Sequence, residues 1–121
     1  MADQLTEKII AAAIEVHKTL GPELLETIYE EALCHEFRLA NINFQRQIAV
    51  NVNYKGHVIQ GQRLDLLVEE VVVIEIKSLR TLPEIAISQL LSYLKATNLK
   101  RGLLINFGEK QLTSGIKRIS L

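Results

Sequence analysis

Val71-Val72-Val73-Ile74-Glu75-Ile76-Lys77 is a run of seven residues of which five are apolar, and it predicts a strand at the centre of a sheet. Side chains alternate between the two faces of a strand, so Glu75 and Lys77 should lie on the same face. A carboxylate buried among apolar side chains without a partner is costly. Glu75 therefore needs a cation, which is Lys77, an arginine or a bound metal ion.

The residues near the N-terminus predict a pair of helices. Apolar residues recur at helical spacing from residue 6 to about residue 20, where Gly21-Pro22 interrupts the pattern. A second helix is expected to start near Pro22 or Glu23 and to end at residues 39–41. Its apolar face consists of Leu25, Ile28, Tyr29, Ala32, Leu33 and Phe37.

The next segment predicts two antiparallel strands that lead into the central one. From Phe44 the apolar residues recur with a period of two, and Asn53-Tyr54-Lys55-Gly56 provides the residues of a hairpin turn. The returning strand is expected to continue to Leu67. Glu69-Glu70 then forms a short polar turn.

The residues after the central strand predict a helical crossover and one more buried strand. Thr81-Leu82-Pro83-Glu84 resembles a capping box with a helix-starting proline, followed by a helix to about residue 96. Residues 102–107 are expected to form a strand parallel to the central one, and residues 115–121 a short edge strand. The expected fold is a mixed sheet flanked by helices. The inward face of the crossover helix is predicted to contain Ile85, Leu90, Leu91 and Leu94.

Composition favours one domain spanning residues 1–121. Apolar residues make up 48% and charged residues 23% of the chain, as in ordinary globular proteins. The single cysteine, Cys34, cannot form an internal disulfide and is expected to be a small buried hydrophobe. The chain has no leader-like N-terminus and no run near the ~20 apolar residues of a membrane span, so we expect a cytoplasmic protein that does not contact membranes.

Charge is unevenly distributed along the chain. Residues 1–76 carry 6 basic and 12 acidic side chains, whereas residues 77–121 carry 8 and 2, which gives a formal net charge of zero. Neutrality argues against a protein that coats nucleic acid by charge alone. The basic C-terminal third is either a surface that attracts a phosphate backbone or simply a solvated face.

The central strand and its neighbour together suggest a metal site. If the turn at Glu69-Glu70 brings the preceding strand alongside, Asp65 lies next to Glu75. Two carboxylates and the backbone carbonyl of Ile76 form a set of oxygen ligands suited to Mg²⁺ or Mn²⁺. Lys77 is placed to orient a water or to stabilise a phosphoryl transition state. The alternative is an ordinary ion pair between Glu75 and Lys77.

Several motifs together resemble the PD-(D/E)xK nuclease superfamily. Asp65 followed by Glu75-Ile76-Lys77 on adjacent strands is similar to its signature, although the proline of the motif is absent. Gln89 and Tyr93 are similar to the QxxxY motif of its RecB-type branch. Residues 20–33 resemble the segment that names the GxxExxY family, with Glu26 and Tyr29 in place and Glu23 where the first glycine is expected. His17 matches the same pattern.

This resemblance implies a restriction-endonuclease-like α/β core and a metal-dependent nuclease. The implied metal ligands are Asp65, Glu75 and Ile76, with Glu26 directed toward the same site from its helix. The implied catalytic groups are Lys77, Glu26, Gln89 and Tyr93. Mg²⁺ or Mn²⁺ is the implied cofactor, and the reaction is hydrolysis of a phosphodiester by metal-activated water. The implied substrate is nucleic acid, with DNA favoured over RNA, and a homodimer or a partner protein is possible.

Other interpretations remain open for individual residues and for the whole chain. Glu26 is either a ligand or a solvated helix carboxylate, and Gln89 and Tyr93 either contact substrate or pack on the sheet. His17 is favoured as a half-buried structural residue over a general base. The chain as a whole is alternatively a nuclease-fold module that binds nucleic acid or protein without catalysis, since it carries no additional DNA-reading domain.

Overall fold

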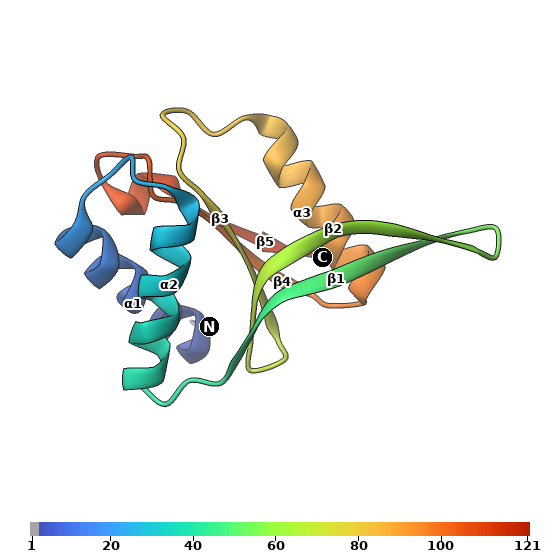
Figure 1. The fold of residues 1–121 in the computed structure, drawn as a ribbon, viewed down its shortest axis with the longest axis horizontal. Helices are drawn as coiled ribbons and strands as arrows, with labels where there is room; N and C mark the ends of the chain where they lie inside the picture. The colour runs from blue at the N-terminus through green and yellow to red at the C-terminus, as the bar shows by residue number, and fades with distance from the viewer. Residues whose placement is uncertain (1–2) are drawn as a thin grey trace.

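The protein has three layers, with a mixed sheet between a helix pair and a single helix (Figure 1). The computed structural model describes residues 3–121. The five-stranded sheet has the order β1-β2-β3-β4-β5, in which β3 and β4 are parallel and the other neighbours are antiparallel. The elements are α1 (Gln4–Leu20), α2 (Glu26–Leu39), β1 (Phe44–Tyr54), β2 (His57–Val68), β3 (Val72–Lys77), α3 (Glu84–Thr97), β4 (Arg101–Asn106), a short 3₁₀ helix η1 (Leu112–Gly115) and β5 (Ile116–Ser120).

The architecture expected from the sequence is confirmed, including the central position of β3, its parallel partner β4 and the edge strand β5. No helix within residues 3–121 is both long and apolar enough to cross a bilayer. Each face of the sheet has its own apolar core. One core lies against α1 and α2, and includes Tyr29, Phe37, Ile74, Ile76 and Phe107. The other lies against α3, and includes Val50, Leu64, Val73, Leu90 and Leu94.

The start of α2 differs from the expected one. The helix begins at Glu26 rather than near Pro22, and Glu23 has a left-handed backbone with φ 68°. The buried Tyr29 hydroxyl donates to the Gly21 carbonyl at 2.5 Å and accepts the Leu24 N–H at 3.0 Å. These bonds hold residues 21–24 in a loop over the tyrosine, so the helix starts only after that loop.

The apolar face expected for α2 is also partly wrong. Leu25 is 71% exposed and Ile28 is exposed as well, whereas Glu30 and Cys34 are buried with Tyr29. The later start of the helix explains Leu25, which precedes the first turn. Cys34 is a buried free cysteine, as expected.

The crossover helix α3 starts at Glu84, without the expected capping box. Pro83 occupies the N-cap position and no side chain caps the helix, so Thr81 lies outside it. Ile85 is 62% exposed, contrary to expectation, and Leu91 is half-buried. The buried residues of α3 are Ala86, Leu90 and Leu94, which recur every four residues.

The strands β1 and β2 change faces along their length. Phe44 and Leu66 pack toward α1 and α2, whereas Ile48 and Leu64 pack toward α3. A regular strand would keep Phe44 and Ile48 on one side. The exchange occurs at Gln47, whose backbone is left-handed with φ 52° and which, like Asp65, is left out of the pairing between Arg46↔Leu66 and Ile48↔Leu64. The register itself shifts further along, between Ala49 and Asn51. This local break in the pairing, together with the left-handed residue, turns the side chains on either side of Gln47 to opposite faces of the sheet.

Glu23→Gly should raise the free energy of unfolding by about 1 kcal/mol, because glycine adopts a left-handed backbone without steric cost. The substitution also removes the Glu23–Arg80 ion pair, which is exposed and contributes little. Glu23→Ala is the matched control, since it removes the ion pair but retains the strain. Urea denaturation measures both variants. A Glu23→Gly protein no more stable than Glu23→Ala contradicts the strain at this position.

Candidate active site at the β2–β3 junction

Asp65 and Glu75 lie together where β2 separates from β3. The paired residues of these strands run from Val68↔Val72 to Leu66↔Ile74 and then stop. At the next position the carboxylate of Asp65 accepts the Ile76 N–H at 2.7 Å. A side-chain oxygen thus replaces the backbone acceptor that a continued ladder would supply. The expected proximity of Asp65 to the Glu75-Ile76-Lys77 segment is present.

Glu75 is a buried carboxylate with an unsatisfied oxygen. Glu75 is 9% exposed, and its Oε1 atom has no hydrogen-bond partner within residues 3–121. Burial, followed by the negative charge of Asp65, raises the pKa of Glu75 to about 7, although Lys77 acts in the opposite direction. Unsatisfied buried polar atoms are uncommon in native proteins and suggest a missing ligand, ion or water.

Asp65 is perturbed in the same direction. Burial raises the pKa of Asp65 above its ordinary value, the bond from Ile76 lowers it, and the charges of Glu30 and Glu26 raise it again. Two carboxylates that both bind protons more tightly than usual form a site in which positive charge is favoured. Such a site fits a divalent cation on the basis of its chemistry.

Lys77 is half-buried at the end of β3, and its backbone carbonyl accepts the Phe107 N–H at 2.8 Å. The structure shows no ion pair between Lys77 and Glu75 among the described residues. The ammonium group is nevertheless near enough to lower the pKa of both carboxyls. The simple ion-pair interpretation of the ExK sequence therefore does not account for Glu75.

Tyr93 approaches the same site from α3. Burial, together with the charges of Glu75 and Asp65, raises the pKa of its hydroxyl. That hydroxyl donates a hydrogen bond to the Gln62 side chain of β2. Gln89 lies one turn earlier on α3 and is partly exposed. Tyr93 is thus near the carboxylates, whereas Gln89 has no recorded side-chain bond among residues 3–121.

Glu26 is exposed in the first turn of α2. Its charge contributes to the raised pKa of Asp65 and Glu75, so it is on the same side of the molecule. It does not complete a ligand cluster, because no group of three His, Cys, Asp or Glu side chains within residues 3–121 is positioned to hold a metal. The structure brings Asp65 and Glu75 together as a pair, on which Glu26 acts through its charge.

A network on α2 that sequence reasoning missed supports this pair. Glu30 is buried and accepts hydrogen bonds from Arg46 at 2.7 Å and from Gln47 at 2.8 Å. Arg46 also pairs with Glu31 at 2.8 Å. These contacts fix the left-handed Gln47 opposite Asp65. The spacing of Glu30, Cys34 and Phe37 on one helix face is the sequence signal that indicates burial.

His17 and a neighbouring pocket lie outside the carboxylate pair. The His17 Nε2 atom is 2.8 Å from the Glu109 carbonyl, which agrees with the structural interpretation of this histidine. A cavity of about 700 Å³ lies beside the loop that contains Glu109. Neither Asp65 nor Glu75 lines it. The lining residues are Pro22, Glu23, Arg80, Gly108, Glu109, Lys110, Gln111 and Ser114. We place the candidate site at Asp65 and Glu75 and not at the cavity, because the two buried carboxylates can bind a cation or a proton and do not line the cavity.

The raised pKa of Glu75 predicts a pH dependence of stability in the absence of metal. The folded protein binds this proton more tightly than the unfolded chain, so the free energy of unfolding should fall as pH rises from 4.5 to about 7. The fall is about 3 kcal/mol at most. Glu75→Gln should remove most of it. Urea denaturation across this pH range, with a chelator present, measures the effect.

Glu70→Gln is the matched control for this experiment. It removes an exposed carboxylate from the β2–β3 turn, so its slope should match that of the wild type. Equal slopes for the wild type and Glu75→Gln would contradict the assignment of the transition to Glu75.

The comparisons with known proteins identify the family of this chain. A family model described as the PD-(D/E)XK nuclease superfamily matches residues 3–119. No curated protein is similar enough to count as a match. A solved structure described as "Crystal structure of SSO0001" superposes with a TM-score of 0.49 at 19% identity, covering 98% of this chain and 78% of that one. On the match over residues 3–119, the chain belongs to the PD-(D/E)XK nuclease superfamily.

Proposed function

We propose that this protein is a nuclease that requires Mg²⁺ or Mn²⁺ and hydrolyses phosphodiester bonds of nucleic acid, with DNA favoured over RNA. The observation that carries the proposal is the unsatisfied Oε1 atom of Glu75, buried beside Asp65. The superfamily consists of nuclease-fold proteins, so a site for a divalent cation is the consistent explanation for this pair.

The groups that would hold the cation are the carboxylates of Asp65 and Glu75 and the backbone carbonyl of Ile76. Hard oxygen ligands of this kind suit Mg²⁺ and Mn²⁺. When bound, such an ion supplies positive charge that activates a water and offsets the charge developing on the phosphate. Because no group of three ligating side chains is assembled within residues 3–121, Glu26 is proposed as a supporting group and not as a direct ligand.

The remaining polar groups are proposed to act on the substrate. Lys77 carries the positive charge that stabilises the phosphoryl oxygens in the transition state. Tyr93, near both carboxylates, orients either the water or a phosphate oxygen, and Gln89 contacts the substrate one helical turn away. These positions also support assignment to the GxxExxY family and the RecB-type branch, as does the left-handed backbone at Glu23, where that motif has glycine.

The alternative function is a nuclease-fold module that binds nucleic acid or a protein without catalysis. One observation favours it, namely that no group of three ligating side chains is assembled within residues 3–121. The presence of Asp65, Glu75 and Lys77 in the same chain favours the nuclease over the non-catalytic module. A module has no need for two carboxylates whose burial disfavours their charged forms.

Calorimetric titration with Mg²⁺ and Mn²⁺ tests the proposal. Asp65→Asn and Glu75→Gln should each abolish binding, because each removes charge from the pair. Lys77→Met should retain metal binding but reduce cleavage of DNA by about a hundredfold or more, as removal of a transition-state donor typically does. Glu70→Gln, exposed in the β2–β3 turn, is the control and should behave as the wild type.

Two results would overturn the proposal. If the wild type binds neither ion at millimolar concentration, the site has no metal and the module interpretation holds. If Lys77→Met cleaves as fast as the wild type, the observed activity does not arise from this site.

A further inference from the structure

The end of the β1–β2 hairpin projects away from the rest of the protein (Figure 1). We call residues 51–60 the arm. Every residue of the arm is exposed, and the packed core against α3 ends at Val50. The arm nevertheless carries four large apolar side chains, which are Val52, Tyr54, Val58 and Ile59. The side chain of Tyr54 is 58% exposed. Two-stranded hairpins are marginally stable in isolation, and exposed apolar strands favour association. The arm therefore has the properties of a binding element.

One face of the arm is continuous with the candidate active site. Ile48 and Val50 pack toward α3, so alternation places Val52 and Tyr54 on that same face. Their cross-strand partners are Ile59 and His57. Further along β2, Gln62 accepts the hydroxyl of Tyr93, which is near the carboxylates. A molecule that reaches Asp65 and Glu75 on this side of the sheet can extend along the arm.

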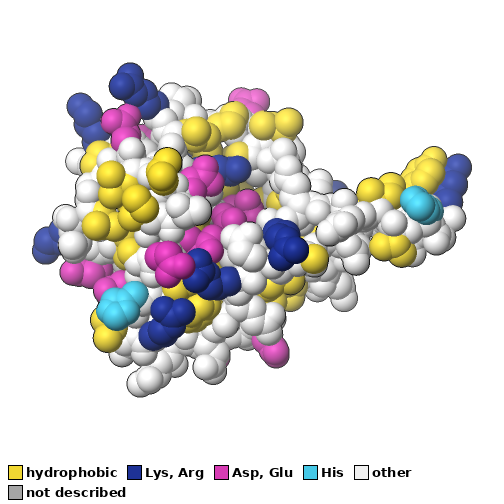
Figure 2. Space-filling view, in the orientation of Figure 1, with side chains coloured by type: hydrophobic (Ala, Val, Ile, Leu, Met, Phe, Trp, Pro, Cys, Tyr) yellow, Lys and Arg dark blue, Asp and Glu magenta, His cyan; other side chains and the backbone are white. Residues whose placement is uncertain are grey.

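The arm and its base have a one-sided charge. Residues 37–64 contain four basic side chains and no acidic one, although the whole chain carries 14 of each. Of these four, Arg38 belongs to α2 and Arg46 is paired with Glu30 and Glu31. The other two, Lys55 in the turn and Arg63 in β2 next to the core, are exposed, and neither is in an ion pair among the described residues. In Figure 2 the projecting arm shows hydrophobic, basic and histidine side chains, whereas acidic side chains gather on the body.

This charge pattern selects between the possible partners. A second copy of the arm would bring Lys55 and Arg63 close to identical cations, which disfavours arm-to-arm packing. A polyanion instead complements both cations.

We propose that the arm binds single-stranded nucleic acid and guides the strand to the carboxylate pair. Tyr54 and His57, which are cross-strand neighbours, provide rings on which unpaired bases stack. Lys55, whose ammonium group lies 5.4 Å from the Tyr54 ring centre, contacts the adjacent phosphate. Bases within a duplex are already stacked on one another, so this surface suits a single strand. The inference rests on the proposed function, for which it names the form of the substrate.

The length of the arm sets the length of strand it can hold. His57 and Asp65 are eight positions apart in β2, which at ~3.3 Å per residue corresponds to about 26 Å. A strand of about 12 nucleotides therefore reaches from the carboxylates past the tip, within the site sizes known for single-strand binding.

Fluorescence anisotropy with labelled single-stranded DNA and RNA of about 12 nucleotides tests the inference, with a chelator present to prevent cleavage. Tyr54→Ala and His57→Ala should each weaken binding by about tenfold or more, since one stacked base is lost. Tyr54→Phe keeps the ring and should retain affinity. Lys55→Glu should also weaken binding and reduce its dependence on salt. All of these residues are exposed, so the variants should fold.

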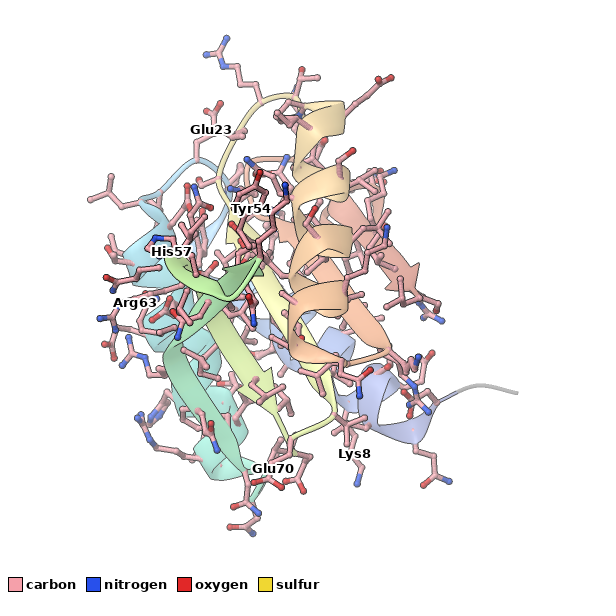
Figure 3. The ribbon with its side chains drawn as sticks, turned by 90° about the vertical axis from the view of Figure 1, so that its right-hand side faces the viewer. Lys8, Glu23, Tyr54, His57, Arg63 and Glu70 are labelled. Atoms are coloured by element: carbon pink, nitrogen blue, oxygen red, sulfur yellow. The ribbon has the colours of Figure 1, made fainter. Side chains whose placement is uncertain are left out.

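Lys8→Glu is the control for charge. Lys8 is an exposed lysine on α1, and Figure 3 shows it well apart from Tyr54 and His57. This variant has the same change in net charge as Lys55→Glu but should bind as the wild type. Equal weakening by the two variants would mean that only the overall charge matters, and would overturn the inference.

Analytical ultracentrifugation separates nucleic-acid binding from self-association. The inference is overturned if Tyr54→Ala binds the oligonucleotides as well as the wild type does. It is equally overturned if the wild type is a dimer that Tyr54→Ala dissociates with no loss of affinity for the oligonucleotides. In that case the arm is an interface between two copies of this chain.

Hydrolysis of bis(4-nitrophenyl) phosphate distinguishes failure of this inference from failure of the proposed function. This small diester engages the site without reaching the arm. Hydrolysis of the diester combined with unchanged binding of oligonucleotides by Tyr54→Ala refutes the inference alone. Absence of hydrolysis and of metal binding, combined with arm-dependent binding of oligonucleotides, refutes the proposed function and leaves the arm as a binding element.

Discussion

The bond between the Asp65 carboxylate and the Ile76 N–H is the constraint on which the candidate site depends. At this position β2 turns away from β3, and without the carboxylate the Ile76 N–H would lack its acceptor in a buried region. The same bond fixes Asp65 beside Glu75, where burial disfavours both negative charges and the charge of Asp65 further disfavours that of Glu75. The Asp65 side chain thus has two roles: it completes the hydrogen bonding of β3, and it contributes to a buried negative site that favours a positive charge. The buried Glu30 of α2 reinforces the arrangement through its bonds to Arg46 and Gln47.

The sequence was informative wherever one pattern determined the outcome. The apolar run before Lys77 correctly predicted a central strand, because a strand with so few polar side chains must be covered on both faces. The helix between β3 and β4 correctly predicted that these strands are parallel. The pairing of Asp65 with the ExK strand followed from the short turn between β2 and β3. These inferences required only local spacing and the direction of the chain.

The errors arose where distant contacts override local patterns. Nothing near Glu23 indicates that the Tyr29 hydroxyl holds the preceding loop and delays the start of α2. Ile85 is apolar, but the buried face of α3 is formed by Ala86, Leu90 and Leu94, so the Ile85 side chain lies in solvent. The change of faces at Gln47 was also unpredicted, because a glutamine rather than a glycine adopts the left-handed backbone there. The Glu30 network that holds this glutamine joins residues of α2 and β1, so sequence spacing does not reveal it.

The register shift between Ala49 and Asn51 divides the hairpin into two parts that are held by different contacts. Toward the body, the faces of β1 and β2 are set by the cores on both sides of the sheet and by Asp65. Beyond Val50 no core contacts the strands, so residues 51–60 are constrained only by pairing with each other. Adding or removing two residues in each strand preserves which side chains lie on which face. The hairpin is therefore a place where related chains can vary in reach while the geometry of the carboxylates stays fixed.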